Sequence, residues 1–225
     1  MAEKSLKKKY GEEFIIHNVW ERDQTRFFAD CSPKDNPRAV FLASIYKNGG
    51  GVFDDEYAEA VVALEVDDIL RDGFEEAFEN CYVKSHVSKF YTRPEFESPK
   101  ILTLEEYLEA TDTRIMCYVF ADNSNGSEKV AEREYRYLSE ILPQKVEEGG
   151  IGDNIFDAMQ VYFTDEEMVK ESEEYFLLNT DIRGEFDSKT YKCNWFFCSY
   201  QDKKISKSYE EYLEKRIDDG NETTN

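Results

Sequence analysis

Residues 6–47 read LKKKYGEEFIIHNVWERDQTRFFADCSPKDNPRAVFLASIYK, and we interpret this stretch as the nucleus of the fold. A short basic helix that ends at Gly11 is followed by apolar, β-rich segments at 13–20, 26–31 and 38–46, separated by polar turn residues. This order predicts a helix followed by an antiparallel β-meander. We expect 13–20 to be an interior strand, because both of its faces carry apolar side chains.

The longest helical pattern begins near Asp54 and keeps apolar side chains at helical spacing as far as Cys81. Gly73 lies inside it, and glycine costs about 1 kcal/mol against alanine in a helix interior. We therefore expect a kink or break at Gly73. A further strand is predicted at 83–91, where the side chains show period-two character.

The run 92–102 contains two prolines and alternating charge, which is typical of a linker. It would separate a helix-plus-meander lobe at 1–91 from a second α/β lobe at 103–225, with one continuous domain as the alternative. The class predicted for the whole chain is α+β, and in the second lobe helices cover a sheet. Strands are expected there at 114–121, 154–163 and 189–200, the last of them central, with a helix at 128–146 and capping-box helix starts at Thr103/Glu106, Thr164/Glu167 and Ser208/Glu211.

The composition is strongly acidic, with 49 Asp and Glu against 28 Lys and Arg and a net charge of −21. An aromatic content of 15% argues for a folded protein and against a disordered acidic chain. Because phosphate groups repel such a surface, we expect no direct nucleic-acid binding and consider a basic protein the natural partner. The simpler interpretation, that the charge only maintains solubility, stays open.

Cysteine usage and hydropathy indicate the cellular compartment in which the protein works. The five cysteines form no CxxC motif, so we interpret them as buried, reduced thiols. No stretch approaches the roughly 18 apolar residues of a membrane span. We therefore expect a soluble protein without a membrane span, cytoplasmic as written, or exported if a signal segment has been removed.

No motif for catalysis, cofactor binding or metal binding occurs at a diagnostic spacing, so no residue is assigned to any of these roles and no cofactor is expected. His17 and His86 are the only histidines, and each lies in a predicted strand. Cys193 and Cys198 fall on opposite faces of the last predicted strand and cannot chelate one metal. The run DNSNG at 122–126 lacks the EF-hand spacing and is interpreted as a turn before a helix.

The chain carries 15 Tyr and 16 Phe, more than we can assign to the core from the pattern alone. Tyrosine is favoured at protein interfaces, because its ring is apolar and its hydroxyl is polar. Four tyrosines on highly charged predicted helices are candidates for an interaction surface, with the simpler alternative that they cover the sheet with their hydroxyls in solvent. They are Tyr135, Tyr137, Tyr209 and Tyr212.

The helix-to-strand junction LKKKYGEEFIIHNVW, together with the later PKDNPRAVF, resembles a group of small uncharacterised proteins from Gram-positive bacteria. These proteins are often lipoprotein-like or carried on mobile elements. The resemblance covers about the first 47 residues, and it implies a helix-plus-sheet module without an assigned activity. This chain departs from the lipoprotein pattern because it shows no signal sequence and no lipidation cysteine.

Three functional hypotheses follow from the sequence. The first is a nonenzymatic binding or interaction protein that presents an acidic, tyrosine-bearing surface to a basic protein partner. The second is an acidic inhibitor, either an immunity-type protein or a DNA mimic, that binds a basic nuclease in a salt-sensitive manner. The third is a hydrolase whose carboxylates and histidines converge only in three dimensions. The sequence predicts neither an oligomeric state nor a biological process.

Overall fold

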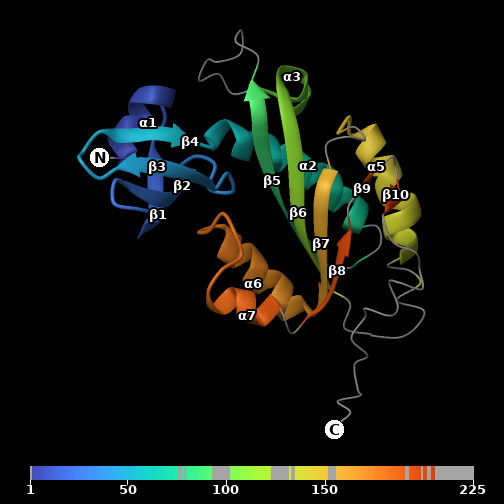
Figure 1. The fold of residues 1–225 in the computed structure, drawn as a ribbon. Helices are drawn as coiled ribbons and strands as arrows, with labels where there is room; N and C mark the ends of the chain where they lie inside the picture. Colours follow the sequence, from blue (N-terminus) through green and yellow to red (C-terminus); the bar gives the residue numbers. More distant parts are fainter. Residues whose placement is uncertain are drawn as a thin grey trace.

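The computed structural model shows two four-stranded sheets, with a long helix leading from the first sheet to the second (Figure 1). The predicted α+β class is confirmed. None of the helices in the described ranges is both long and apolar enough to cross a bilayer. The structure describes residues 2–75, 78, 80–92, 102–122, 132, 135–151, 156–190, 193–198, 200–201 and 204–205.

The first sheet is an antiparallel meander with the strand order β1-β2-β3-β4, and α1 packs against it. Phe14, Phe41 and Tyr57 bring their rings together in its core, with centroids between 5.2 and 5.7 Å apart. The predicted helix and meander are therefore confirmed. The elements are α1 (Ala2–Tyr10), β1 (Phe14–Glu21), β2 (Arg26–Pro33), β3 (Phe41–Tyr46) and β4 (Gly51–Asp55).

Two features of this sheet differ from the prediction. β1 lies at the end of the strand order and is not interior, and its apolar residues Ile15 and Val19 are 38% and 57% exposed. β4 is a fourth strand of the meander, which the sequence pattern did not predict. It forms because Gly49 and Gly51 adopt positive φ angles of 85° and 81°, which a hairpin turn requires and most side chains disfavour.

The second sheet has the order β5-β6-β7-β8, in which β6 and β7 are parallel and the other neighbours antiparallel. β5 pairs with β6, so it belongs to this sheet and not to the first lobe, where the predicted division at 92–102 placed it. β8 is the last strand in this order and not a central one, because it pairs with β7 alone among the sheet's strands. The strands are β5 (Cys81–Thr92), β6 (Thr111–Asp122), β7 (Phe156–Thr164) and β8 (Asn194–Cys198).

Helices cover the second sheet, as predicted, and they lie on both of its faces. One face packs against α2, α3, η2 and α5, and the other against α6 and α7 (Figure 1). A two-stranded ribbon of β9 and β10 follows β8. The bounds are α2 (Tyr57–Glu75), α3 (Leu104–Ala110), η2 (Tyr137–Ile141), α5 (Leu142–Glu148), α6 (Glu166–Phe176), α7 (Glu185–Thr190), β9 (Tyr200–Gln201) and β10 (Lys204–Ile205).

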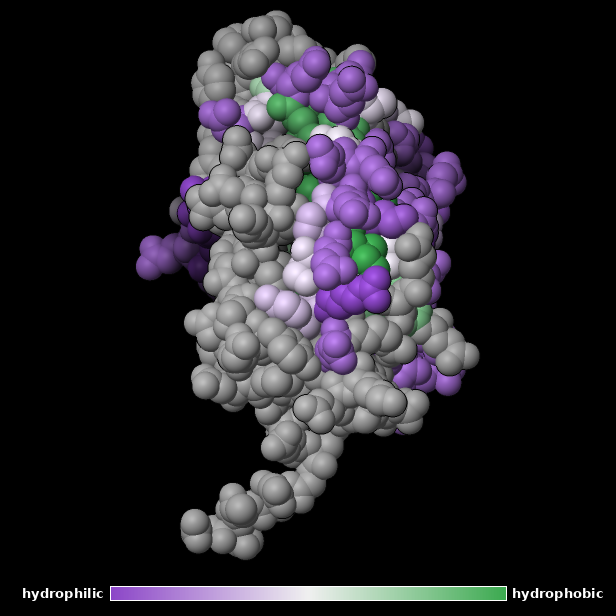
Figure 2. Space-filling model, turned by 90° about the vertical axis from the view of Figure 1, so that its right-hand side faces the viewer, coloured by the Kyte–Doolittle hydropathy of each residue, from purple (hydrophilic) through white to green (hydrophobic). Residues whose placement is uncertain are grey.

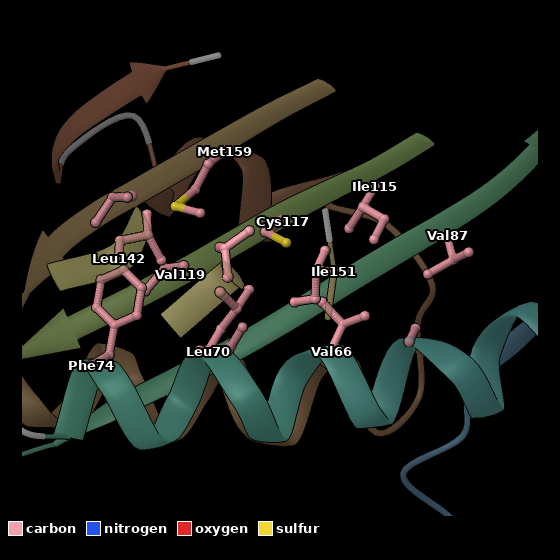
Figure 3. Packing of buried hydrophobic residues seen from close by; sticks show 14 of the residues in the cluster. Val66, Leu70, Phe74, Val87, Ile115, Cys117, Val119, Leu142, Ile151 and Met159 are labelled. Carbon is pink, nitrogen blue, oxygen red and sulfur yellow. The ribbon is translucent and has the colours of Figure 1, made fainter. Parts of the chain in front are cut away.

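Side chains along β6 alternate between the two helical layers. Ile115, Cys117 and Val119 point toward α2 and are buried there with Leu70 and Phe74 (Figure 3). The alternate residues of the same strand face the opposite layer, where α6 and α7 pack. This period of two places a second, more polar set of side chains beneath α7.

Gly73 does not break α2, which continues to Glu75, so the predicted break is wrong. A Cβ atom on Gly73 would lie 2.4 Å from the Tyr137 hydroxyl oxygen, much closer than real contacts allow. Glycine is needed at this position because the Tyr137 side chain of η2 approaches α2 closely.

The helix caps agree with the prediction in one case and differ in another. Thr103 and Glu106 form the expected capping box at the start of α3. At α6, however, the cap is Asp165 and not Thr164, because Asp165 Oδ1 accepts the Met168 amide at 2.8 Å. The third predicted box, Ser208 with Glu211, lies outside the described residues.

Candidate functional site

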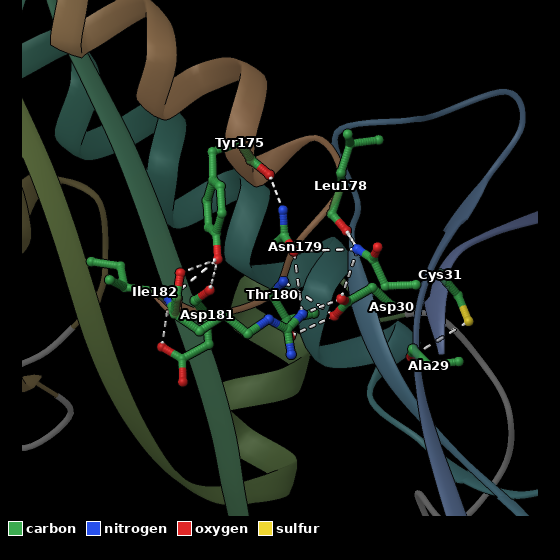
Figure 4. Close-up of polar contacts among 11 residues, drawn as sticks. Ala29, Asp30, Cys31, Tyr175, Leu178, Asn179, Thr180, Asp181 and Ile182 are labelled. Carbon is green, nitrogen blue, oxygen red and sulfur yellow. Dashed lines mark hydrogen bonds and ion pairs between the residues drawn. The ribbon is translucent and has the colours of Figure 1, made fainter. Parts of the chain in front are cut away.

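The segment 178–183, between α6 and α7, contacts the first sheet through the buried carboxylate of Asp30 (Figure 4). Thr180 Oγ1 donates to Asp30 Oδ1 at 2.8 Å, and the Arg183 guanidinium forms an ion pair with Asp30 Oδ2. Asn18 Nδ2 donates to the same carboxylate at 3.3 Å. These bonds satisfy a charge that is fully buried, and they join β2 to the segment.

Arg183 is held by three kinds of group at once. It pairs with the Asp30 carboxylate, donates to the side-chain amide oxygen of Asn179 at 3.4 Å, and its guanidinium carbon lies 4.1 Å from the centre of the Trp20 ring. A carboxylate, an amide oxygen and an aromatic ring thus form a complete guanidinium site inside this protein.

Tyr175 of α6 fixes the conformation of the segment 178–183. Its hydroxyl lies 3.0 Å from the carbonyl oxygen of Asp181 and accepts the Arg183 amide at 3.2 Å. The ring of Tyr175 stacks on that of Phe186, with centroids 4.2 Å apart. Both ends of the segment are therefore attached to the helical layer beside the second sheet.

On its other side the same segment closes a cavity of about 210 Å³ against β6 and β7. Asp181 and Ile182 belong to the segment, and the remaining lining comes from the two strands and α7. We call this space the tyrosine–aspartate cavity. Its lining residues are Tyr118, Gln160, Tyr162, Asp181, Ile182, Asp187 and Thr190.

The cavity combines two carboxylates with two phenols and an amide. The Tyr118 hydroxyl donates to Asp181 Oδ1 at 3.0 Å, and the Tyr162 hydroxyl donates to Gln160 Oε1 at 2.8 Å. Burial, followed by the charge and hydrogen bond of Asp181, raises the pKa of Tyr118, so the phenol keeps its proton. Within the described part of the chain, the Asp187 carboxylate accepts no hydrogen bond and forms no ion pair.

Aromatic neighbours hold the two tyrosines of the cavity in place. The Tyr162 ring stacks on Phe120, with centroids 4.8 Å apart and an angle of 12° between the planes. The Tyr118 ring lies nearly parallel to Phe176, at 6.0 Å and 19°. The polar cavity is thus built on an ordered apolar layer. Ligand binding would therefore cost little side-chain conformational entropy.

Comparisons with known proteins place the fold but not the activity. No family model matches the chain, and no curated protein matches it. A crystal structure of a DUF5037 family protein from Ruminococcus gnavus ATCC 29149 is similar, with a TM-score of 0.68, 19% sequence identity and coverage of 98% of both chains. At this identity the likeness shows a shared fold over the whole length, and the function has to be argued from the site.

Ser32, His17 and Asp30 have the composition of a hydrolytic triad but not its arrangement. His17 Nε2 lies 2.9 Å from Ser32 Oγ, yet Ser32 is completely buried. Burial lowers the pKa of His17, against the opposing charge of Asp30. Among the described contacts no hydrogen bond joins His17 to Asp30, whose oxygens bond instead to Arg183, Thr180 and Asn18. A substrate has no access to this serine, so we derive no nucleophilic chemistry from it.

His86 lines a second void, of only about 10 Å³, between the sheets. Such a volume holds about one water molecule. Lys84 lines the same void, and burial lowers the pKa of its amine, which the charge of Asp67 opposes. Within the described ranges no carboxylate or cysteine forms a hydrogen bond with His86, so the histidine has no catalytic partner there.

The structure describes two of the four tyrosines predicted for an interaction surface, Tyr135 and Tyr137. Tyr137 is only 1% exposed and packs in the core beside Phe74, so its assignment to a surface is wrong. Tyr135 is partly buried against the same core. Tyr209 and Tyr212 lie outside the described residues. The tyrosines at the cavity, Tyr118 and Tyr162, come from strands and not from charged helices.

The four cysteines whose side chains the structure describes are all free, and the predicted burial is confirmed for three of them. Cys31, Cys117 and Cys193 are buried, and Cys81 is half-buried. The side chain of Cys198 and the residues 123–126 lie outside the described part. Where the chain is described, no three potential metal ligands of the His, Cys, Asp and Glu types come together.

The face that carries α5, at the right of Figure 1, is mainly hydrophilic where it is described (Figure 2). Small hydrophobic areas lie between the polar side chains. Glu140, Glu147 and Glu148 are exposed on η2 and α5. This face lies across the second sheet from the tyrosine–aspartate cavity, which is lined from the side of α7.

Proposed function

We propose that this protein is a nonenzymatic interaction protein that binds a basic protein partner, and that the tyrosine–aspartate cavity receives a cationic side chain of that partner. The observation that carries the proposal is the lining of the cavity. It brings together Asp181 and Asp187 with two tyrosine rings, and no described lining residue is basic. Carboxylates and aromatic rings are the groups that bind organic cations in proteins.

The charge of the whole chain supports the same partner. A net charge of −21 attracts a basic protein over a distance set by the ionic strength and accelerates its association. An acidic inhibitor of a basic nuclease is one form that this proposal can take, with the same salt-sensitive association. We place this activity in the cytoplasm, in keeping with the free cysteines of the described region.

The test is a calorimetric titration with the peptide acetyl-Gly-Arg-Gly-amide at low salt. The Asp187→Asn variant removes one charge from the cavity, and Asp187 makes no described side-chain bond that the fold would lose. Glu185→Gln is the matched control, because Glu185 is exposed on the same helix but does not line the cavity.

We expect Asp187→Asn to lower the affinity for the peptide about threefold to tenfold, since a half-exposed charge-assisted hydrogen bond is lost. Glu185→Gln should leave the affinity within about twofold of wild type, because an exposed charge outside the site contributes little. Absence of binding to wild type, or equal losses in the two variants, contradicts the proposal.

A further inference from the structure

The structure contains two recognition environments on opposite sides of the segment 178–183. On one side, Arg183 is bound by a carboxylate, an amide oxygen and an aromatic ring, supplied by Asp30, Asn179 and Trp20. On the other side lies the tyrosine–aspartate cavity. The first environment shows which arrangement of groups this protein uses to hold a guanidinium.

The cavity offers the same three kinds of group. Asp181 and Asp187 supply carboxylates, Gln160 supplies an amide oxygen, and Tyr118 and Tyr162 supply aromatic rings. Gln160 Oε1 already accepts the Tyr162 hydroxyl at 2.8 Å, but a carbonyl oxygen has two lone pairs and can accept a second hydrogen bond. An ammonium group matches these partners less well, because it is a compact point charge without a planar fork of donors.

From this correspondence we infer that the cation recognised by the cavity is a guanidinium, carried by an arginine side chain of the partner. The inference rests on the proposed function and specifies its ligand. Two carboxylates on different elements, the segment 178–183 and α7, can each accept from a different edge of one planar guanidinium. The tyrosine rings supply the apolar and π surfaces on which such a plane stacks.

The size of the cavity is compatible with this ligand. A volume of about 210 Å³ is below that of drug-binding pockets but sufficient for the end of one long side chain. A whole peptide would not fit, so the rest of the partner would lie outside the cavity. The cavity then selects one residue type of the partner and not an extended sequence.

The experiment compares two peptides of equal charge and length, acetyl-Gly-Arg-Gly-amide and acetyl-Gly-Lys-Gly-amide, by calorimetry on the full chain. We expect the arginine peptide to bind at least about fivefold more tightly, because only guanidinium donates in two directions within one plane. The Gln160→Met variant removes the amide oxygen while keeping a side chain of similar length. This variant should lower the affinity for the arginine peptide and leave the affinity for the lysine peptide nearly unchanged.

The outcomes separate this inference from the proposed function. If the lysine peptide binds as tightly as the arginine peptide, and both depend on Asp187, the guanidinium inference is overturned while the cavity remains a cation site. If neither peptide binds in an Asp187-dependent manner, both are overturned. Because Tyr162 loses its acceptor in Gln160→Met, the thermal midpoint of that variant is measured in parallel, and Tyr162→Phe serves as a second variant that keeps Gln160.

Discussion

Arg183 and Asp30 are separated by 153 positions in the sequence, yet they form an ion pair whose carboxylate is completely buried. The pair joins the first sheet to the segment that also closes the tyrosine–aspartate cavity. Thr180 and Asp181 are adjacent, and they bond to Asp30 and Tyr118 respectively. The position of the cavity wall therefore depends on a contact with the other sheet.

The Asp30→Asn variant should be markedly less stable than wild type, because it leaves the Arg183 charge without its counter-ion. We expect a loss of about 2 kcal/mol in the free energy of unfolding, below the full cost of breaking a buried pair, since the Arg183 side chain is 35% exposed. Urea unfolding measures this loss in the free energy of unfolding. Glu171→Gln, which breaks the exposed pair with Lys189, is the control and should cost less than about 0.5 kcal/mol. Equal losses would show that the Asp30 pair does not stabilise the fold.

Asp67 should make stability depend on pH in a mildly acidic range. Burial raises the pKa of its carboxyl from 3.8 to about 6, while Lys84 and Ser85 oppose the shift. The folded state therefore binds a proton more tightly than the unfolded state does. The stabilisation from this group is complete below the unfolded pKa and is lost as the pH rises through the folded pKa.

The free energy of unfolding of wild type, measured relative to Asp67→Asn, should accordingly fall by about 2–3 kcal/mol between pH 4 and pH 7. Urea unfolding at each pH checks this. A difference between the two proteins that stays constant over the range, or that rises with pH, would mean that the Asp67 carboxyl is not perturbed in this direction.

The Gly73→Ala variant separates packing from helix propensity. Propensity alone predicts a gain of about 1 kcal/mol in stability. The structure predicts a net loss of about 1–2 kcal/mol instead, because the added methyl group would meet the Tyr137 hydroxyl at 2.4 Å. Thermal unfolding distinguishes the predicted gain from the predicted loss. In a Tyr137→Phe background the same substitution should cost less, and an equal cost in both backgrounds would exclude this contact as the reason.

The cap of α6 gives a paired test of neighbouring residues. Asp165→Ala should lower the free energy of unfolding by about 1 kcal/mol, because the Met168 amide loses its acceptor. Thr164→Ala should cost less, since Thr164 is the last residue of β7 and does not cap the helix. If Thr164→Ala is the more damaging of the two, the Asp165 cap is not the main stabilising contact at the start of α6.

The sequence predicted individual elements better than their arrangement. Period-two patterns and apolar, β-rich segments located β2, β3, β5, β6 and β7, because side-chain alternation is a local property of the backbone. The pattern does not specify which strand pairs with which. This is why β1 and β8 were expected in interior positions and lie at the ends of their sheets, and why β5 was assigned to the wrong one.

The cavity could not be predicted from local spacing, because its residues come from β6, β7, the segment 178–183 and α7. One signal was present. Tyr118 and Phe120 alternate with Cys117 and Val119 along β6, which predicts a face carrying a phenol next to an apolar ring. That signal does not reveal that Asp181 and Asp187 will cover this face, since their position depends on tertiary contacts with Asp30 and Tyr175.

The central claim, that a basic ligand binds in the tyrosine–aspartate cavity, is tested most directly by NMR chemical-shift mapping. The ¹⁵N-labelled chain is titrated with acetyl-Gly-Arg-Gly-amide, and amide signals are followed residue by residue. We predict that the largest shifts occur at Asp181, Ile182 and Asp187, and that they saturate together at one ligand concentration. Shifts scattered over acidic residues elsewhere, or no saturating shifts at these three amides, would contradict the claim.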